Sequence, residues 1–158
     1  MLPESFVSLT SVEFLYSWRL VIAVLLGALM GIERSLAGKH AGMRTYALVS
    51  LGSCVFAIVG ILASMEMIGF SGLNPLQIAS SVVIGIGFIG TGLAAFRGEH
   101  SAELTTASGV WVVSAVGLAC GFGLFFIAIV GTLLSIIVFS IVAGLEHWLL
   151  AHVGSKKK

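Results

Sequence analysis

The sequence predicts an all-α protein, a polytopic bundle of about five transmembrane helices. Of its 158 residues, 58% are hydrophobic and only 9% are charged, whereas about a quarter of the residues in an ordinary soluble domain carry charge. No soluble fold of this size has enough interior to hide that much apolar surface. The apolar residues also lie in long runs, which a lipid bilayer accommodates without burying them inside the protein.

Five runs are long enough to span, since about 20 apolar residues in a helix cross a hydrocarbon core of about 30 Å. The stretch 104–145 has no charged residue and is about twice as long as one span, so it must turn back on itself. Gly121 and Gly123 predict that turn, because glycine tolerates the dihedral angles of a tight hairpin. The predicted spans are residues 14–32, 46–65, 78–96, 104–121 and 122–145.

The basic residues predict the orientation of the bundle. With the N-terminus outside, the outer connection 66–77 has no Lys or Arg. This asymmetry follows the positive-inside rule and predicts an N-out, C-in topology. We expect an extracytoplasmic leader over residues 1–13, a transmembrane domain over 14–145 and a cytoplasmic tail over 146–158. The basic residues on the inner side are Arg34, Lys39, Arg44, Arg97, Lys156, Lys157 and Lys158.

Two of the predicted hairpins have the same spacing between a glycine and the start of the next helix. Gly31 and Gly92 are each followed 13 residues later by the start of a helix that returns outward, near Arg44 and Thr105 respectively. Parallel repeats about an axis along the membrane normal occur in transporters. These marks predict a parallel repeat of two helical hairpins, and a coincidence of hairpin lengths is the alternative.

The first span differs from the others because its uninterrupted apolar run, residues 20–32, is short. It covers only about 20 Å of helix, so Arg19 or the neighbouring Glu33 and Arg34 must lie near hydrocarbon depth. We expect Arg19 to snorkel outward into water. A glutamate side chain is too short to snorkel well, so Glu33 with Arg34 is predicted to be functional.

The polar residues at the inner rim are candidates for a ligand-binding or partner-binding site. The second and fourth helices begin on this side, so their free N–H groups and positive dipole ends face inward. Together with arginines, such helix ends can bind an anion. In the alternative interpretation, Glu33 pairs with Arg34 or Arg44 and the threonines only cap helices. The candidates are Glu33, Arg34, Lys39, Arg44, Thr45, Thr105 and Thr106.

The glycines predict close packing of helices. Gly27 with Gly31, and Gly117 with Gly121, form GxxxG pairs, and small residues let helix backbones approach within a subunit or across a dimer. The third span has its own glycines, which predict either helix packing or the wall of a pore. These are Gly85, Gly87, Gly90 and Gly92.

The cysteines, Trp111 and the histidines give no indication of a catalytic site. Cys54 and Cys120 are expected to be small buried hydrophobes. Trp111 lies about two turns into the fourth helix, where we expect it to pack in the core with a partner for its indole N–H. The four histidines are dispersed, so neither a metal nor a cofactor is expected. The chain has no nucleophile–base pair, so an enzyme is the least expected function, and the alternative is an active site at the membrane surface that uses Glu33 and Glu103. A net charge of +1 without a basic stripe indicates no nucleic-acid partner.

With the spans laid out, three ordered motifs resemble the membrane domain of the MgtC/SapB family, and the resemblance covers almost everything from Arg19 to Leu145. LGALMGIER over 26–34, followed by AGMRT over 41–45, is similar to the family's GxER…AGLRT signature. GIGFIGTG over 85–92 is similar to GIGFLGAG, and LTTAS over 104–108 with Trp111 is similar to GLTTAA…W. The motif positions are Glu33, Arg34, Arg44, Thr45, Thr105, Thr106 and Trp111.

The chain departs from the family pattern in two places. Glu103 stands where the family usually has glycine, which puts a carboxylate beside the proposed anion site. Larger members continue into a cytoplasmic ACT-like domain, and no function of that domain is carried over.

The resemblance implies a role in bacterial adaptation to low magnesium and in survival inside host cells, through action on other membrane machinery such as the ATP synthase. We therefore expect a non-enzymatic, multi-pass protein of the bacterial inner membrane, a homodimer that regulates a membrane protein or binds an anionic ligand at its cytoplasmic face. The alternative is a small transporter or channel with a path along the third span. Arg34→Ala or Arg44→Ala is expected to abolish function without preventing insertion.

Overall fold

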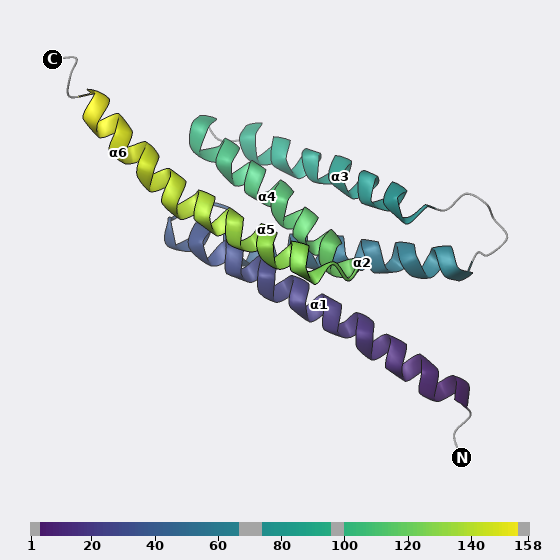
Figure 1. Cartoon of the computed structure of the whole chain (residues 1–158). Coiled ribbons are helices and arrows are strands. Elements are labelled where there is room, and N and C mark those ends of the chain that lie inside the picture. The colour runs from purple at the N-terminus through teal and green to yellow at the C-terminus, as the bar shows by residue number, and fades with distance from the viewer. Residues whose placement is uncertain (1–3, 67–73, 96–99, 155–158) are drawn as a thin grey trace.

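The structure, a computed structural model, describes residues 4–66, 74–95 and 100–154. Its first four helices are α1 (Glu4–Leu36), α2 (Met43–Glu66), α3 (Pro75–Ala95) and α4 (His100–Gly121). The last rod consists of α5 (Phe125–Ile137), the π-helical segment η1 (Val138–Val142) and α6 (Ala143–Gly154), which follow one another without a break. The chain reverses direction at each connection, so the C-terminal end of α1 and the end of α6 lie toward the same end of the bundle (Figure 1).

The predicted fold class is confirmed: the described residues are helical apart from short connections, and five helices are long and apolar enough to cross a membrane. The first and last helices run further than the predicted spans. Helix α1 begins at Glu4 because no glycine or proline interrupts residues 4–26. The last rod remains helical past Leu145 as far as Gly154. The orientation and the repeat stay predictions.

Helix α4 is the centre of the bundle and packs against α1, α2, α3 and α5. The GxxxG glycines allow the close approach of α1 to α2 and of α4 to α2. A Cβ built on Gly27 would lie 2.7 Å from the Cβ of Ser50, and one built on Gly121 would lie 2.8 Å from the carbonyl oxygen of Cys54. Such distances are too short for real Cβ atoms. The predicted role of these glycines in close packing is therefore confirmed within the subunit.

The interior of the bundle contains small polar side chains. The buried Ser50 hydroxyl donates to the carbonyl oxygen of Ala23 at 2.7 Å, and the Ser53 and Ser114 hydroxyls are 2.8 Å apart. Large apolar side chains such as Phe88 and Phe126 are instead exposed on the outer surface. Hydrogen bonds inside and apolar surface outside suit a bundle whose solvent is lipid.

Helix α3 lies at the edge of the bundle, against α2 and α4 (Figure 1). A Cβ on Gly90 would be in ordinary contact with Ala107, at 3.7 Å, whereas one on Gly85, Gly87 or Gly92 would meet nothing within 4 Å. Of the four predicted glycines, only Gly90 is therefore close enough for an added Cβ to contact another helix of this subunit.

The predicted hairpin at Gly121–Gly123 is confirmed. Helix α4 ends at Gly121, α5 begins at Phe125, and Gly123 has a φ of +79°, which favours glycine. Arg19 lies against this turn: its Nη1 donates to the carbonyl oxygen of Gly121 at 2.7 Å. Its Nε is buried without a hydrogen-bond partner among the described residues. Arg19 therefore binds the end of α4, instead of only snorkelling into water as expected.

Candidate functional site

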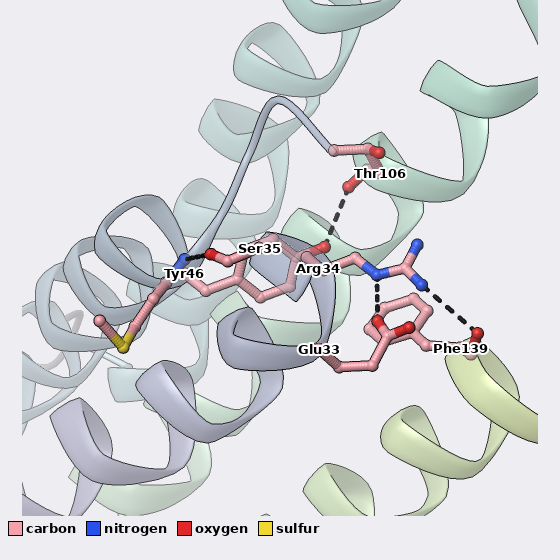
Figure 2. A network of polar contacts seen from close by, with 7 residues as sticks. Glu33, Arg34, Ser35, Tyr46, Thr106 and Phe139 are labelled. Atoms are coloured by element: carbon pink, nitrogen blue, oxygen red, sulfur yellow. Dashed lines mark hydrogen bonds and ion pairs between the residues drawn. The ribbon is translucent and has the colours of Figure 1, made fainter. Parts of the chain in front are cut away.

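Arg34 is a buried charged residue at the inner end of the bundle, which is the end where α1 stops and α2 starts. Its side chain is 4% exposed, and its Nε forms an ion pair with the 20% exposed Glu33 carboxylate. Its Nη2 donates to the carbonyl oxygen of Phe139 at 3.4 Å, and its guanidinium carbon lies 4.0 Å from the centroid of the Phe139 ring. Figure 2 shows the guanidinium held between Glu33 and Phe139. A cation over a ring in a desolvated place is stabilised by about 2 kcal/mol.

Phe139 belongs to η1, the π-helical part of the last rod. A π-helix forms i→i+5 hydrogen bonds, is rarely more than a turn long and often occurs at functional sites. The residues of η1 are VFSIV, which nothing in the sequence distinguishes from an ordinary apolar helix. Sequence reasoning therefore missed both η1 and Phe139.

Tyr46 connects Phe139 to the other helices. It is fully buried, and its ring meets that of Phe139 edge-on, with centroids 6.4 Å apart. Its hydroxyl donates to the backbone carbonyl oxygen of Thr106 at 3.4 Å (Figure 2). A Cβ on Gly109 would overlap the Tyr46 hydroxyl and lie 2.7 Å from the Phe139 ring. Contacts from α1, α2, α4 and η1 thus meet around one ring.

A turn after α1 brings Lys39 back toward Arg34. The N–H of Lys39 donates to the carbonyl oxygen of Arg34 at 2.9 Å, and Gly38 has a φ of +67°. A left-handed glycine just after a helix is the usual way to close its C-terminal end. The turn places a second cation beside the buried one.

A cavity of about 660 Å³, called here the polar cavity, opens beside these residues. It has both polar and apolar walls, and it is the most polar of the large cavities found. Its cations and carboxylates are present in equal number, so it suits a ligand that presents both signs of charge. The lining consists of Glu33, Arg34, Ala37, Lys39, Thr105, Val138, Phe139, Val142, Ala143, Glu146 and Leu150.

The structure therefore brings together four of the predicted site residues, Glu33, Arg34, Lys39 and Thr105. Glu146 of α6, which was not among the predicted site residues, also lines the cavity. The Glu33–Arg34 ion pair agrees with the alternative interpretation, in which Glu33 pairs with Arg34 or Arg44. Arg97 lies outside the described residues, and the described side chains do not include that of Glu103.

The threonines do not cap the helix N-termini, contrary to the alternative interpretation. The hydroxyl of Ser35, and not that of Thr45, accepts the N–H of Met43 at the start of α2, at 2.9 Å. Helix α4 begins at His100, because residues 100–103 contain no helix breaker. Thr105 and Thr106 therefore lie one turn inside the helix and do not cap it.

Two further candidates lie away from the polar cavity. Arg44 is exposed on α2 and does not line the cavity. Trp111 is 51% exposed and lies in a groove between α3 and α4, with Gly87, Gly90 and Thr91. The expectation that Trp111 packs in the core is wrong, since its face of α4 points toward the peripheral helix α3.

Among the residues that the structure describes, no three His, Cys, Asp or Glu side chains come together as a metal site. Cys54 and Cys120 are both buried, and neither forms a disulfide bond.

Comparison with known proteins gives several relatives. "Putative magnesium transporter YhiD" of Escherichia coli K12 is 36% identical over 125 residues, which cover 78% of this chain and 58% of YhiD. "Protein MgtC" of Salmonella typhimurium is 37% identical over 121 residues, which cover 77% of this chain and 49% of that protein. "Protein SrpB" of Synechococcus elongatus is 35% identical over 133 residues, which cover 78% of this chain and 72% of SrpB.

The chain spans little more than half the length of YhiD. No solved structure matches it. The model of the MgtC family matches residues 20–148, which include α2, α3 and α4, the inner part of α1 and most of the last rod. This match covers most of the chain and confirms the family that the three motifs predict: the chain belongs to the MgtC family.

Proposed function

We propose that the protein is a non-enzymatic regulator in the bacterial inner membrane, which binds an anionic group in the polar cavity and acts on another membrane protein. The observation that carries the proposal is Arg34, a buried guanidinium that borders an open cavity at the expected cytoplasmic end. Buried charges inside membrane proteins are costly and usually functional.

The geometry of Arg34 leaves part of it available. Its Nε binds Glu33 and its Nη2 binds Phe139, and within the described residues no hydrogen bond of Nη1 accompanies these two. Lys39 lines the same cavity. An anionic group between Nη1 and the Lys39 ammonium would receive two charge-assisted hydrogen bonds.

The name of one relative connects the family with magnesium. The relatives include a protein named MgtC and one named as a putative magnesium transporter. We propose that this chain acts in adaptation to low magnesium, as the resemblance implies. It forms a homodimer, and this homodimer acts on a different membrane protein such as the ATP synthase.

The experiment is growth in magnesium-limited medium of the host strain that lacks the gene. The chain should restore growth, and Arg34→Ala should abolish restoration at an equal protein level in the membrane fraction. Arg44→Ala removes the same charge outside the cavity. Loss in Arg34→Ala alone places the function in the cavity, and loss in both variants extends the site to the inner loop. Normal growth with both variants contradicts the proposal.

The second candidate is a small transporter with a path along α3. The name of YhiD favours it, as do the open glycines of α3. Purified protein in vesicles should then carry Mg²⁺, measured with an entrapped fluorescent indicator, and Gly87→Leu should reduce the flux. Flux no faster than through protein-free vesicles contradicts this alternative.

A further inference from the structure

We propose that the polar cavity and a neighbouring groove between α4 and α5 form one binding site for a zwitterionic phospholipid, phosphatidylethanolamine. This inference rests on the proposed function and names the ligand of its cavity. The headgroup lies in the polar cavity, and one acyl chain lies in the groove, called here the acyl groove. The acyl groove has a volume of about 530 Å³ and is lined by Leu104, Thr105, Ser108, Gly109, Val112, Gly131, Leu134, Ser135, Val138 and Phe139.

The polar cavity and the acyl groove are neighbours. They share Thr105, Val138 and Phe139 in their linings, so a ligand can pass from one to the other along a common wall. The three shared residues come from α4 and η1. The π-helical segment therefore forms the border between a polar compartment and an apolar one.

The acyl groove is apolar toward a ligand, although two serines line it. The Ser108 hydroxyl donates to the carbonyl oxygen of Leu104 at 2.8 Å, and the Ser135 hydroxyl donates to that of Gly131 at 2.7 Å. Both donors are thus already used within their own helices. Apart from Thr105, the remaining lining has no polar side chain, which suits a hydrocarbon chain.

The depth of the two compartments fits a lipid. Thr105 is the second residue of the span Leu104–Gly121, so the polar cavity lies at the edge of the apolar slab. Val112 lies seven residues further along α4, about 10 Å deeper at the rise of an α-helix, and it lines the acyl groove. The polar end is therefore at the headgroup level, and the apolar end runs toward the middle of the bilayer.

The charges select the headgroup. Glu33 is already paired with Arg34, and no ion pair links Lys39 to Glu146 within the described residues. Lys39 and the Nη1 of Arg34 can bind a phosphate, and Glu146 can bind an ammonium on the same headgroup, since all three residues line the polar cavity. Phosphatidylethanolamine presents both groups, whereas phosphatidylglycerol presents only the phosphate.

Binding can be measured by native mass spectrometry of the purified full chain in detergent, titrated with phosphatidylethanolamine, phosphatidylglycerol or tail-free glycerophosphoethanolamine. Lys39→Ala removes a phosphate contact, and Ser135→Leu fills the acyl groove. Ser80→Leu is the matched control, because Ser80 is also bonded to its own helix, at 3.0 Å to Leu76, but is exposed on α3. Thermal unfolding in detergent checks that each variant is folded.

We expect phosphatidylethanolamine to bind about tenfold more weakly to Lys39→Ala, which is the effect of losing one charge-assisted contact. Binding to Ser135→Leu should also weaken, because the leucine side chain occupies the space of the acyl chain. Ser80→Leu should bind like the unsubstituted chain. Equal binding by Ser135→Leu and Ser80→Leu overturns the acyl groove. Equal affinity for the two lipids, or for the tail-free headgroup, overturns the assignment of the ligand.

The two proposals fail separately. If Arg34→Ala abolishes growth in low magnesium but Lys39→Ala and Ser135→Leu bind lipid normally, the lipid inference is wrong and the regulatory function stands. If Lys39→Ala and Ser135→Leu lose lipid binding as expected, but a strain carrying Arg34→Ala grows normally in low magnesium, the lipid site stands without the proposed function.

Discussion

The guanidinium carbon of Arg34 lies 4.0 Å from the centroid of the Phe139 ring, a contact between residues that are 105 positions apart in the chain. It fixes the inner end of α1 against the π-helical segment η1. Because Phe139 also meets Tyr46, this single ring supports both the buried charge and the packing of α2. The stability of the bundle should therefore depend on an aromatic side chain at this position.

Phe139→Leu should lower the free energy of unfolding by about 1–3 kcal/mol. Leucine keeps most of the apolar volume, but it loses the cation–π contact, which contributes about 2 kcal/mol when desolvated. Thermal unfolding in detergent measures the change. Phe126→Leu is the matched control, because Phe126 is 80% exposed on the outer surface of α5. Equal effects of the two substitutions would show that the stacking on Arg34 contributes nothing.

Gly117→Ala should destabilise the bundle by about 1–3 kcal/mol, the usual cost of overpacking. A Cβ there would overlap the carbonyl oxygen of Ser50, which is backbone and cannot rotate away. Gly85→Ala places the same methyl group in open space and should be neutral or stabilising by up to about 1 kcal/mol, since alanine favours helix. Both are read by denaturant unfolding. A Gly117→Ala protein as stable as Gly85→Ala would contradict the close approach of α2 and α4.

The Ser53–Ser114 hydrogen bond should have a coupling energy of about 0.6 kcal/mol, and no more than about 1.7 kcal/mol, as hydrogen bonds between membrane helices do. The two hydroxyls are 2.8 Å apart and buried between α2 and α4. A double-mutant cycle of Ser53→Ala, Ser114→Ala and the double variant isolates this energy. Strictly additive losses would mean that the two serines do not bond to each other.

Arg19→Ala should increase hydrogen exchange at the end of α4 and in the following turn. The side chain donates to the carbonyl oxygen of Gly121, at the negative end of the helix dipole, where a cation contributes about 0.3–1 kcal/mol. Exchange measured by mass spectrometry should rise in peptides that cover residues 118–125 and stay constant at the start of α2. Unchanged exchange at the turn would remove the capping role of Arg19.

Much of the fold was predictable because membrane folds depend on local composition. The five spans were predicted from apolar runs of the right length, and the last hairpin was predicted from Gly121 and Gly123. Both features can be recognised within a short segment of sequence. Helix boundaries were less accurate. The start of α4 at His100 moved the two threonines away from the capping position, because no breaker marks that start.

The candidate site was predictable only in part. Arg34 stood out as a charge beside a short apolar run, and the inner loop suggested Lys39. The stacking on Phe139 could not be foreseen, because it depends on how α1 and the last rod meet in space. Trp111 was misplaced for the same reason: a motif gives the position of a residue along a helix but not the neighbour that its face meets.

The contrast between the glycines of α4 and those of α3 divides the molecule into a rigid and a permissive part. At Gly117 and Gly121 the distance between helices is set by backbone atoms, so any larger residue requires whole helices to separate. At Gly85, Gly87 and Gly92 there is room for added atoms. Cysteines carrying fluorescent or spin labels can therefore be introduced along α3 to follow the protein in membranes without rebuilding its centre.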